Sequence, residues 1–295
     1  MNIRKFLKII ISLSVGIILF YFFVFVVPQA FRGKINLSPF ILEFGIIKIR
    51  WYGFLIAFAI LISYFISRKN FLKIHKNKGD DFDGAFLIIF ILGLFGARIG
   101  FILQNIPYYS KNIIEIFKIW DGGLSIHGAL IAGIIALFIA QKKYKINLFD
   151  FANSIAPQVL LSGAIGRFGN FFNQEIIGKP TDNVFWKMFI QPENRPIGFE
   201  SSSFYHPVFL YESILLLLAY GVYLLLIKKF RNYLAFAYTL ISYSVIRIIV
   251  EFWRIDYKPI FWKLDLAQLV SSAIIIITIL FAFVSSATGL TKGKK

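Results

Sequence analysis

The residues best suited to chemistry lie at positions 166–178, which read GRFGNFFNQEIIG inside an otherwise apolar chain. Arg167, Asn170 and Asn173 recur every three residues, so they share part of one helix face, and Glu175 follows them. A guanidinium group beside amide groups can hold an anion such as a phosphate through charge-assisted hydrogen bonds. The spacing therefore favours an anion-binding site on this helix.

The same residues also permit a structural interpretation. Arg167 would then be a buried cation paired with Glu175 or Glu212, and the asparagines would link neighbouring helices. Such pairs are common where charged residues lie inside a membrane, because an ionisable residue in a span costs about 2.5–3.5 kcal/mol on insertion scales. Spacing alone leaves both interpretations open.

A second stripe of polar residues occurs in a later apolar segment. Tyr243, Arg247, Glu251 and Arg254 lie four, four and three residues apart, which places them on one helix face. Because one glutamate pairs well with only one arginine, we expect an excess positive charge that suits a phosphate. Arg254 is also typical of a helix-end residue whose charge reaches the membrane surface. Arg98, inside another apolar segment, is a further candidate substrate-binding residue.

His127 is a candidate for proton transfer, since a histidine with a pKa near 6.5 changes charge close to neutral pH. A lone histidine also fits a structural role, which stays open. We expect a solvated His75 in a basic loop and a helix-entry role for His206, which precedes a proline.

The chain has no cysteine, so it supplies no disulfide, no thiolate nucleophile and no cysteine-ligated metal. It also lacks an HExxH zinc motif and a Cys/His cluster. We therefore predict no metal and no cofactor. The remaining Arg, His, Tyr, Asn and Glu side chains can bind a phosphate and move a proton without attacking anything themselves. This inventory predicts a site that joins two bound substrates, one of which would bring any thiol.

The elements that position these residues are predicted to be membrane-spanning helices. Of the 295 residues, 58% are hydrophobic and 16% are charged, against roughly 25% charged in a soluble domain. A span needs about 20 apolar residues. Such segments occur at about 9–27, 51–67, 83–104, 123–141, 150–171, 206–227, 233–252 and 265–284. We expect an all-α polytopic membrane protein with no separate soluble domain.

Charge sets the predicted orientation. The formal net charge is +17, but Lys and Arg fall mainly between the apolar segments, which indicates membrane topology and not nucleic-acid binding. The strongly basic connections fall on one side, so both termini are predicted to be cytoplasmic and the polar span ends to face the outer half of the bilayer. Residues 1–28 are expected to form an uncleaved anchor, because their apolar run is longer than that of a signal peptide. Residues 29–295 would form the main body.

Glycines and repeats add two expectations. Gly163, Gly166 and Gly169 recur every three residues, which predicts close packing of one helix against a neighbour. No convincing internal repeat is present, which disfavours a transporter built from inverted halves.

Seven ordered blocks of the sequence, from about Arg50 to Leu280, resemble the prolipoprotein diacylglyceryl transferase family. They are RWYG at 50–53, GARIG at 96–100, WDGGLSIHG at 120–128, the 166–178 segment, HPVFLYE at 206–212, RIIVEFWR at 247–254 and LAQLVS at 266–271. The resemblance implies an α-helical bacterial membrane enzyme with seven spans, so the helix at 9–27 would be an addition. The family transfers the diacylglyceryl group of phosphatidylglycerol to the lipobox cysteine of a prolipoprotein and releases glycerol phosphate.

The resemblance also implies residue roles. Arg167 resembles the arginine that binds the phosphatidylglycerol head, Arg247 the second cation directed at the phosphate, and His127 the base for the cysteine thiol. The other matching functional positions are Tyr52, Asn170, Glu175, Gly178, Tyr243 and Glu251.

The sequence departs from the family pattern at two places besides the N-terminus. Val208 and Phe209 replace the serine and glutamine of the usual HPSQLYE, and Asn173-Gln174 replaces an asparagine-glycine pair. Two other functions stay open at this point. A lipid or anion transporter would use the arginines as a binding station, and an intramembrane hydrolase would release glycerol phosphate with water alone.

Overall fold

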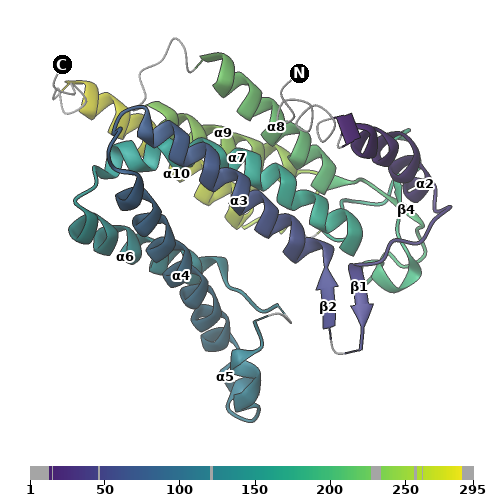
Figure 1. Cartoon of the computed structure of the whole chain (residues 1–295). Coiled ribbons are helices and arrows are strands. Elements are labelled where there is room, and N and C mark those ends of the chain that lie inside the picture. Colours follow the sequence, from purple (N-terminus) through teal and green to yellow (C-terminus); the bar gives the residue numbers. More distant parts are fainter. Residues whose placement is uncertain are drawn as a thin grey trace, which may run out of the picture. The chain divides into compact units, whose positions relative to one another are not determined.

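The computed structural model describes residues 13–14, 16–45, 47–119, 122–226, 234–255, 258–260 and 262–287, and these are mostly helical (Figure 1). The elements in chain order are η1 (Phe22–Val26), α2 (Val27–Phe31), β1 (Phe40–Phe44), β2 (Ile47–Arg50), α3 (Trp51–Leu72), α4 (Gly79–Gln104), α5 (Ile106–Tyr109), η2 (Ile113–Phe117), α6 (Ile126–Tyr144), α7 (Leu148–Asn173), β3 (Met188–Phe189), η4 (Pro192–Asn194), β4 (Phe204–Tyr205), α8 (Val208–Leu226), α9 (Leu234–Glu251) and α10 (Leu266–Ala287). The mostly helical class predicted from the sequence is confirmed.

The chain forms two compact units. The first unit comprises Met1–Ala59, Leu160–Val222 and Leu240–Lys295, and the second comprises Ile60–Val159 and Tyr223–Thr239. Helices α3, α7, α8 and α9 therefore each contribute residues to both units. Arg167 and Arg247 belong to the first unit, whereas Arg98 and His127 belong to the second.

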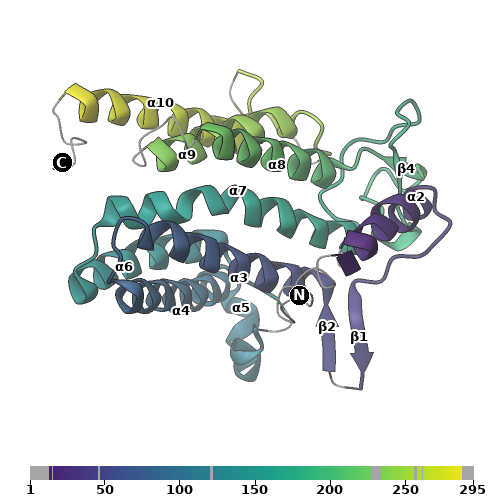
Figure 2. The same ribbon diagram turned by 45° about the horizontal axis from the view of Figure 1, so that its top comes forward.

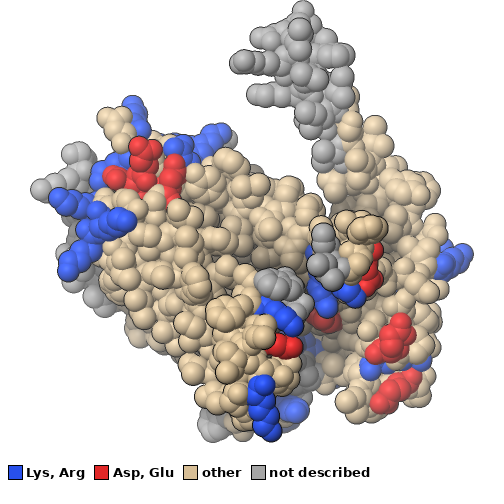
Figure 3. All heavy atoms as spheres, turned by 60° about the horizontal axis from the view of Figure 1, so that its bottom comes forward, with Lys and Arg blue, Asp and Glu red and all other residues tan. Residues whose placement is uncertain are grey.

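Six of the described helices are long and apolar enough to cross a membrane by length and composition. They are Trp51–Leu72, Gly79–Gln104, Ile126–Tyr144, Val208–Leu226, Leu234–Glu251 and Leu266–Phe283. The surface in Figure 3 is accordingly mostly uncharged, and its Lys, Arg, Asp and Glu side chains gather in a few clusters. These features are those of a polytopic membrane protein.

Two of the eight predicted spans do not meet this criterion. Helix α7 has 26 residues, about 39 Å of length, but it carries many polar side chains. Buried residues recur along it, including Asn153, Gln158 and Asn170, so its polar groups face protein. The N-terminal apolar helix Gly16–Phe31 is shorter than 18 residues, and residues 1–12 lie outside the described part of the chain. The count of eight spans thus stays a prediction.

The first unit has its core at the end of α7. Its buried cluster consists of Ala30, Leu37, Phe171, Ile177, Met188, Ile190, Tyr205 and Phe209. Two short antiparallel sheets, β1–β2 and β3–β4, belong to the same unit, and Gly45, with a φ of 56°, lies in the β1–β2 turn. The polar end of α7 is therefore held by packed loops as well as by helices.

The second unit is organised by the contact between α4 and α6, which lie side by side in Figure 2. A Cβ atom built on Gly128 would lie 2.1 Å from the carbonyl oxygen of Gly96, and one on Gly96 would lie 2.1 Å from the Cβ of Ala132. Only glycine permits this approach. Ser125 caps α6, because its hydroxyl oxygen accepts a hydrogen bond from the backbone N–H of Gly128 at 3.4 Å.

Candidate active site

Three helix ends of the first unit meet at Gly178. Its N–H donates to the carbonyl of His206 at 2.8 Å, just before α8, and Gly178 forms an antiparallel bridge with Arg254, just after α9. The N–H of Lys179 donates to the carbonyl of Trp253 at 3.1 Å. A Cβ on Gly178 would lie 2.4 Å from the Trp253 carbonyl oxygen, so this close approach of the two backbones requires glycine. Gly178 ties the end of α7 to the start of α8 and the end of α9.

Because Gly178 joins these helix ends, the positions of three charged residues can be compared by their distance from it along each helix. Arg167 lies six residues before the end of α7, Glu212 four residues after the start of α8, and Arg247 four residues before the end of α9. At 1.5 Å per residue these separations correspond to about 9, 6 and 6 Å along the helices. The two arginines therefore belong to the same end of the helices that carry them.

Arg167 pairs with Glu212. Its Nη2 lies 2.5 Å from the glutamate Oε1, and the two side chains are 23% and 1% exposed. The structural interpretation allowed Glu175 or Glu212 as the partner of Arg167, and the partner is Glu212. The second oxygen of Glu212 is buried and has no hydrogen-bond partner among the described residues, and Arg167 makes no other hydrogen bond with them. The pair is buried but not saturated.

Glu251 pairs with two arginines and not with one. Its Oε2 lies 2.8 Å from Nη2 of Arg247, and its Oε1 lies 3.3 Å from Nε of Arg254. Asp265 lies beside the same carboxylate. The expectation that Glu251 pairs with only one arginine is therefore wrong, because the chain after α9 turns back through the Gly178 bridge and brings Arg254 to Glu251 as well. Nη1 of Arg247 is nevertheless buried with no hydrogen-bond partner among the described residues.

The two asparagines of the 166–178 segment face Glu175. The side-chain amide of Asn170 donates to Glu175 at 3.4 Å and that of Asn173 donates at 3.2 Å. Asn170 is buried, whereas Glu175 is exposed. Tyr243 is half-buried and makes no hydrogen bond with the described residues. Asn170, Asn173 and Glu175 therefore gather polar groups at the end of α7.

Tyr52 is positioned by the glycines of α7. A Cβ on Gly169 would lie 2.4 Å from the Tyr52 ring and 2.9 Å from its Cα, so α3 and α7 approach closely there. The predicted close packing is therefore tightest at Gly169. A Cβ built on Gly163 would lie 3.2 Å from its nearest neighbour, and one built on Gly166 would lie 3.9 Å away, which is an ordinary van der Waals contact. Tyr52 itself is 38% exposed.

Sequence reasoning missed a role for Gln174. This residue is 4% exposed and has a φ of 54°, in the left-handed region that favours glycine. Its side-chain oxygen accepts hydrogen bonds from the N–H of Gln191 at 2.9 Å and from Asn194 at 3.1 Å. The sequence signal that could have indicated this role is that Gln174 replaces the glycine of the family pattern. Gln174 fixes the loop around η4 to the end of α7.

In the second unit, His127 is the second residue of α6. It is exposed and makes no hydrogen bond with the described residues. Its place at the start of α6 is set by Ser125 and by the contact of Gly128 with α4. His75, predicted to be solvated, instead lies with Nε2 2.8 Å from Oδ2 of Asp150.

Arg98 is engaged by the backbone of its own unit. Its Nε donates to Ile116 at 2.8 Å, its Nη1 to Gly122 at 2.8 Å and Gly123 at 3.0 Å, and its Nη2 to Glu115, all at carbonyl oxygens. The side chain is 7% exposed. These bonds hold the 105–123 loop onto α4, and Trp120 and Asp121 of this loop lie outside the described residues.

A hollow of about 300 Å³ beside Arg98 is lined by Phe101, Asn105, Tyr108, Tyr109, Glu115, Lys118, Gly122 and Gly123. Here the hydroxyl of Tyr108 donates to Glu115, which lowers the pKa of that carboxyl below its usual range. The polar groups of this hollow are therefore largely bonded to one another.

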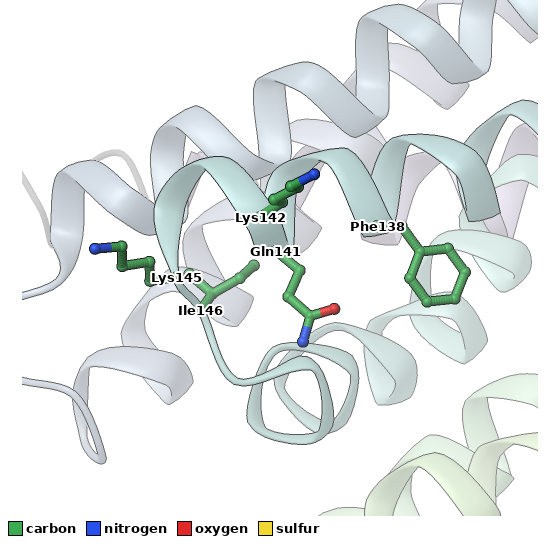
Figure 4. Close-up of a pocket in the computed structure, with 5 residues that line it drawn as sticks. All are labelled: Phe138, Gln141, Lys142, Lys145 and Ile146. Atoms are coloured by element: carbon green, nitrogen blue, oxygen red, sulfur yellow. The ribbon is translucent and has the colours of Figure 1, made fainter.

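A larger hollow of about 570 Å³ lies at the other end of α6 from His127 (Figure 4). It is lined by Phe138, Gln141, Lys142, Lys145 and Ile146. The ammonium groups of Lys142 and Lys145 point away from each other in Figure 4. Because its cations do not converge, this hollow is a poor candidate for the reaction. No group of three or more metal-ligating side chains occurs among the described residues.

The fold defines a polytopic helical membrane protein, in which the buried carboxylates of Glu212 and Glu251 pair with Arg167 of α7 and Arg247 of α9. The sequence model of the family described as prolipoprotein diacylglyceryl transferase matches residues 39–284. The chain belongs to this family and is a transferase.

Curated relatives agree over most of the chain. It is 37% identical over 275 residues to the phosphatidylglycerol–prolipoprotein diacylglyceryl transferase of Thermotoga petrophila, covering 90% of this chain and 92% of the relative. It is 38% identical over 256 residues to the protein of that name from Fervidobacterium nodosum, covering 86% of each chain. The protein of that name from Staphylococcus aureus is 37% identical over 250 residues, covering 82% of this chain and 87% of the relative.

Proposed function

We propose that this protein transfers the diacylglyceryl group of phosphatidylglycerol to the lipobox cysteine of prolipoproteins, forming a thioether and releasing glycerol phosphate. The observation that carries the proposal is the family match over residues 39–284. It is supported by the arrangement of Arg167 and Arg247 at one end of the helices that bear them.

In this proposal the two arginines bind the phosphate of the lipid head. Glu212 holds Arg167 through a single nitrogen, and Arg247 keeps a buried Nη1 donor without a partner among the described residues. A buried donor without a partner costs roughly 1–3 kcal/mol, which a phosphate oxygen would offset. Fixed cations also stabilise the charge that develops on the phosphate as it leaves.

His127 is proposed as the base that takes the thiol proton. A thiol with a pKa of about 8.5 must become a thiolate to attack. The thiolate forms a bond to the glycerol carbon of the diacylglyceryl group, the bond from that carbon to the phosphate oxygen breaks, and its electron pair leaves with glycerol phosphate. Since the chain has no cysteine, the enzyme cannot modify itself in this way.

The remaining candidates are proposed to shape the lipid site. Tyr52, Asn170, Asn173, Glu175, Gly178, Tyr243 and Glu251 would contact the substrate or fix the groups that do. For Arg98 we propose a positioning role, because its donors are used by the 105–123 loop.

The finer topology is part of the proposal. Residues 1–28 would form an anchor and residues 29–295 the transferase body, with eight spans in total. Both termini would lie in the cytoplasm of a bacterium, and the site would face the outer half of its cell membrane. The loop charges support this orientation.

A transfer assay tests the function. Purified full-length protein should move a radiolabelled diacylglyceryl group from phosphatidylglycerol to a peptide with a lipobox cysteine, and not to the same peptide with serine at that position. Folded protein that gives no thioether product would reject the proposal. Glycerol phosphate released at the same rate without peptide would show a hydrolase, and lipid flux without product would show a transporter.

A further inference from the structure

The segment Phe22–Phe31 precedes the family match at residues 39–284, yet it belongs to the core of the first unit. Ala30 is 1% exposed within the buried cluster, and Phe22, Val27 and Phe31 pack against that cluster. An apolar helix that served only as a tether would face lipid on all sides. This helix instead has a protein-facing side.

The protein-facing side contacts the turns of α7 that carry the candidate site. The ring of Phe23 lies 5.4 Å from that of Phe168, in an edge-to-face arrangement. The ring of Phe22 lies 6.0 Å from those of Phe171 and Phe172. Such aromatic pairs stabilise the contact beyond what the area they bury provides. The α7 rings in these pairs belong to Phe168, Phe171 and Phe172, which lie between and after Arg167 and Asn170 in the sequence. This segment of α7 therefore has one face packed with aromatic rings and one polar face.

The chain after this helix is also fixed in place. Gly33 has a φ of 70°, and a Cβ there would lie 2.7 Å from the ring of Phe189 in β3. The N–H of Lys34 donates to the carbonyl of Gln29 at 2.9 Å and closes the helix end. Leu37 then enters the same buried cluster. The segment is therefore anchored at both its helix and its exit.

One departure from the family pattern in HPVFLYE, Phe209, belongs to the same buried cluster. Val208 and Phe209 replace two polar residues, and both are buried, at 0% and 1% exposure. The ring of Phe209 lies 6.0 Å from the ring of Phe171. The ring of Phe31 lies 6.1 Å from the same Phe171 ring, and the two ring planes are tilted by 38°. A buried serine or glutamine would need a hydrogen-bond partner inside this apolar cluster.

We infer that the segment Phe22–Phe31 positions the arginine-bearing end of α7 for catalysis, with Phe22 and Phe31 as positioning residues. This inference rests on the proposed transferase function. The packed aromatic face holds the last two turns of α7, so the polar face keeps Arg167 and Asn170 at the lipid headgroup. A displacement of about 1 Å at a reacting group can reduce a rate by about a hundredfold, so such support matters.

The kinetic test compares full-length variants in the transfer assay. Phe22→Ala and Phe31→Ala should raise the KM for phosphatidylglycerol and lower kcat/KM by about tenfold or more, with the KM for the peptide unchanged. Phe22→Leu, which keeps apolar volume, should restore most of the activity. The matched control is Phe25→Ala, because Phe25 is 47% exposed and pairs with no aromatic ring but that of Tyr21 among the described residues.

A second measurement reads the contact without activity. The chain lacks cysteine, so Phe23→Cys combined with Phe168→Cys provides two unique thiols. A short bifunctional maleimide should link this pair within one chain, as mass spectrometry of a digest would show. The pair Phe25→Cys and Phe168→Cys should link poorly, because Phe25 makes no aromatic contact with α7 among the described residues.

The outcomes separate the two claims. Wild-type protein without transfer, but with the Phe23 and Phe168 thiols linked, would reject the transferase and leave the packing intact. Unlinked thiols would overturn the inference. The inference would also be overturned if Phe22→Ala and Phe31→Ala lowered kcat and left the KM for phosphatidylglycerol unchanged, which would show only a loss of folded protein. It would equally be overturned if these variants had the same kinetics as Phe25→Ala.

Discussion

Arg98 and Arg167 both lie inside long helices, yet their surroundings differ. Arg98 directs its nitrogens at four backbone carbonyls and stacks over the Tyr109 ring at 5.3 Å. Arg167 donates through Nη2 to the carboxylate of Glu212 and makes no other hydrogen bond with the described residues. The first arginine organises a loop, and the second has donors that no described residue accepts.

The difference shows that an arginine within an apolar helix is not by itself a ligand. A guanidinium group has five N–H donors in a fixed geometry. When the chain's own carbonyls accept them, the charge is satisfied locally and serves folding. When a single carboxylate accepts one or two, the remaining donors can bind a phosphate. The number of donors already used separates the two cases.

The largest effect is expected at Arg167. Arg167→Ala should reduce transfer by about a hundredfold or more, since a fixed donor for developing charge is worth several kcal/mol. Kinetics with labelled phosphatidylglycerol would measure this loss. Because the single variant leaves Glu212 unpaired in the interior, Arg167→Ala with Glu212→Gln is the companion that should fold and still be inactive. Lys69→Ala is the control and should change little. Equal losses in Lys69→Ala would mean that the site is misplaced.

A smaller effect, of a different kind, is expected at Arg98. Arg98→Ala removes hydrogen bonds to four backbone carbonyls in partly buried surroundings and should lower the free energy of unfolding by about 3 kcal/mol or more. Thermal unfolding in detergent would report this as a lower midpoint. In the folded fraction the KM for phosphatidylglycerol should stay within about twofold of wild type. A stable Arg98→Ala protein with a raised KM would make Arg98 a ligand and remove the contrast.

Close helix packing gives a third test, within the first unit. Gly169→Ala places a Cβ 2.4 Å from the Tyr52 ring and should destabilise the protein by about 1–3 kcal/mol. Gly166→Ala meets only Ile56 at 3.9 Å and should be neutral or stabilising by up to about 1 kcal/mol, because alanine favours helix. Unfolding midpoints of the two variants would compare them. The expectation fails if both behave alike.

The smallest effect concerns pH and His206. Burial lowers the pKa of His206 below its ordinary value of about 6.5, so the unfolded chain binds this proton more readily than the folded one. The contribution to stability is present above about pH 6.5 and is lost as pH falls through the lower folded pKa. His206→Gln should therefore lose less stability on acidification than wild type. Unfolding midpoints from pH 7 to pH 5 measure the difference, and parallel curves would refute it.

The site could be predicted from the sequence in part. The three-residue spacing identified the polar end of α7, and the glycine repeat predicted the approach at Gly169 that the structure contains. The partner of Arg167 stayed undecided, because Glu212 lies 45 residues away and helix packing selects it. The pairing of Glu251 with Arg254 was also missed, since it depends on the bridge from Gly178.

By itself the sequence determined that this is a helical membrane protein of the transferase family, since composition and ordered motifs are local properties of the chain. Tertiary structure alone decided which charges are neutralised, which donors are left, and that Phe22 and Phe31 pack on α7. The physical reason is that burial and hydrogen bonding depend on contacts between residues far apart in the chain, and spacing along one helix does not specify them.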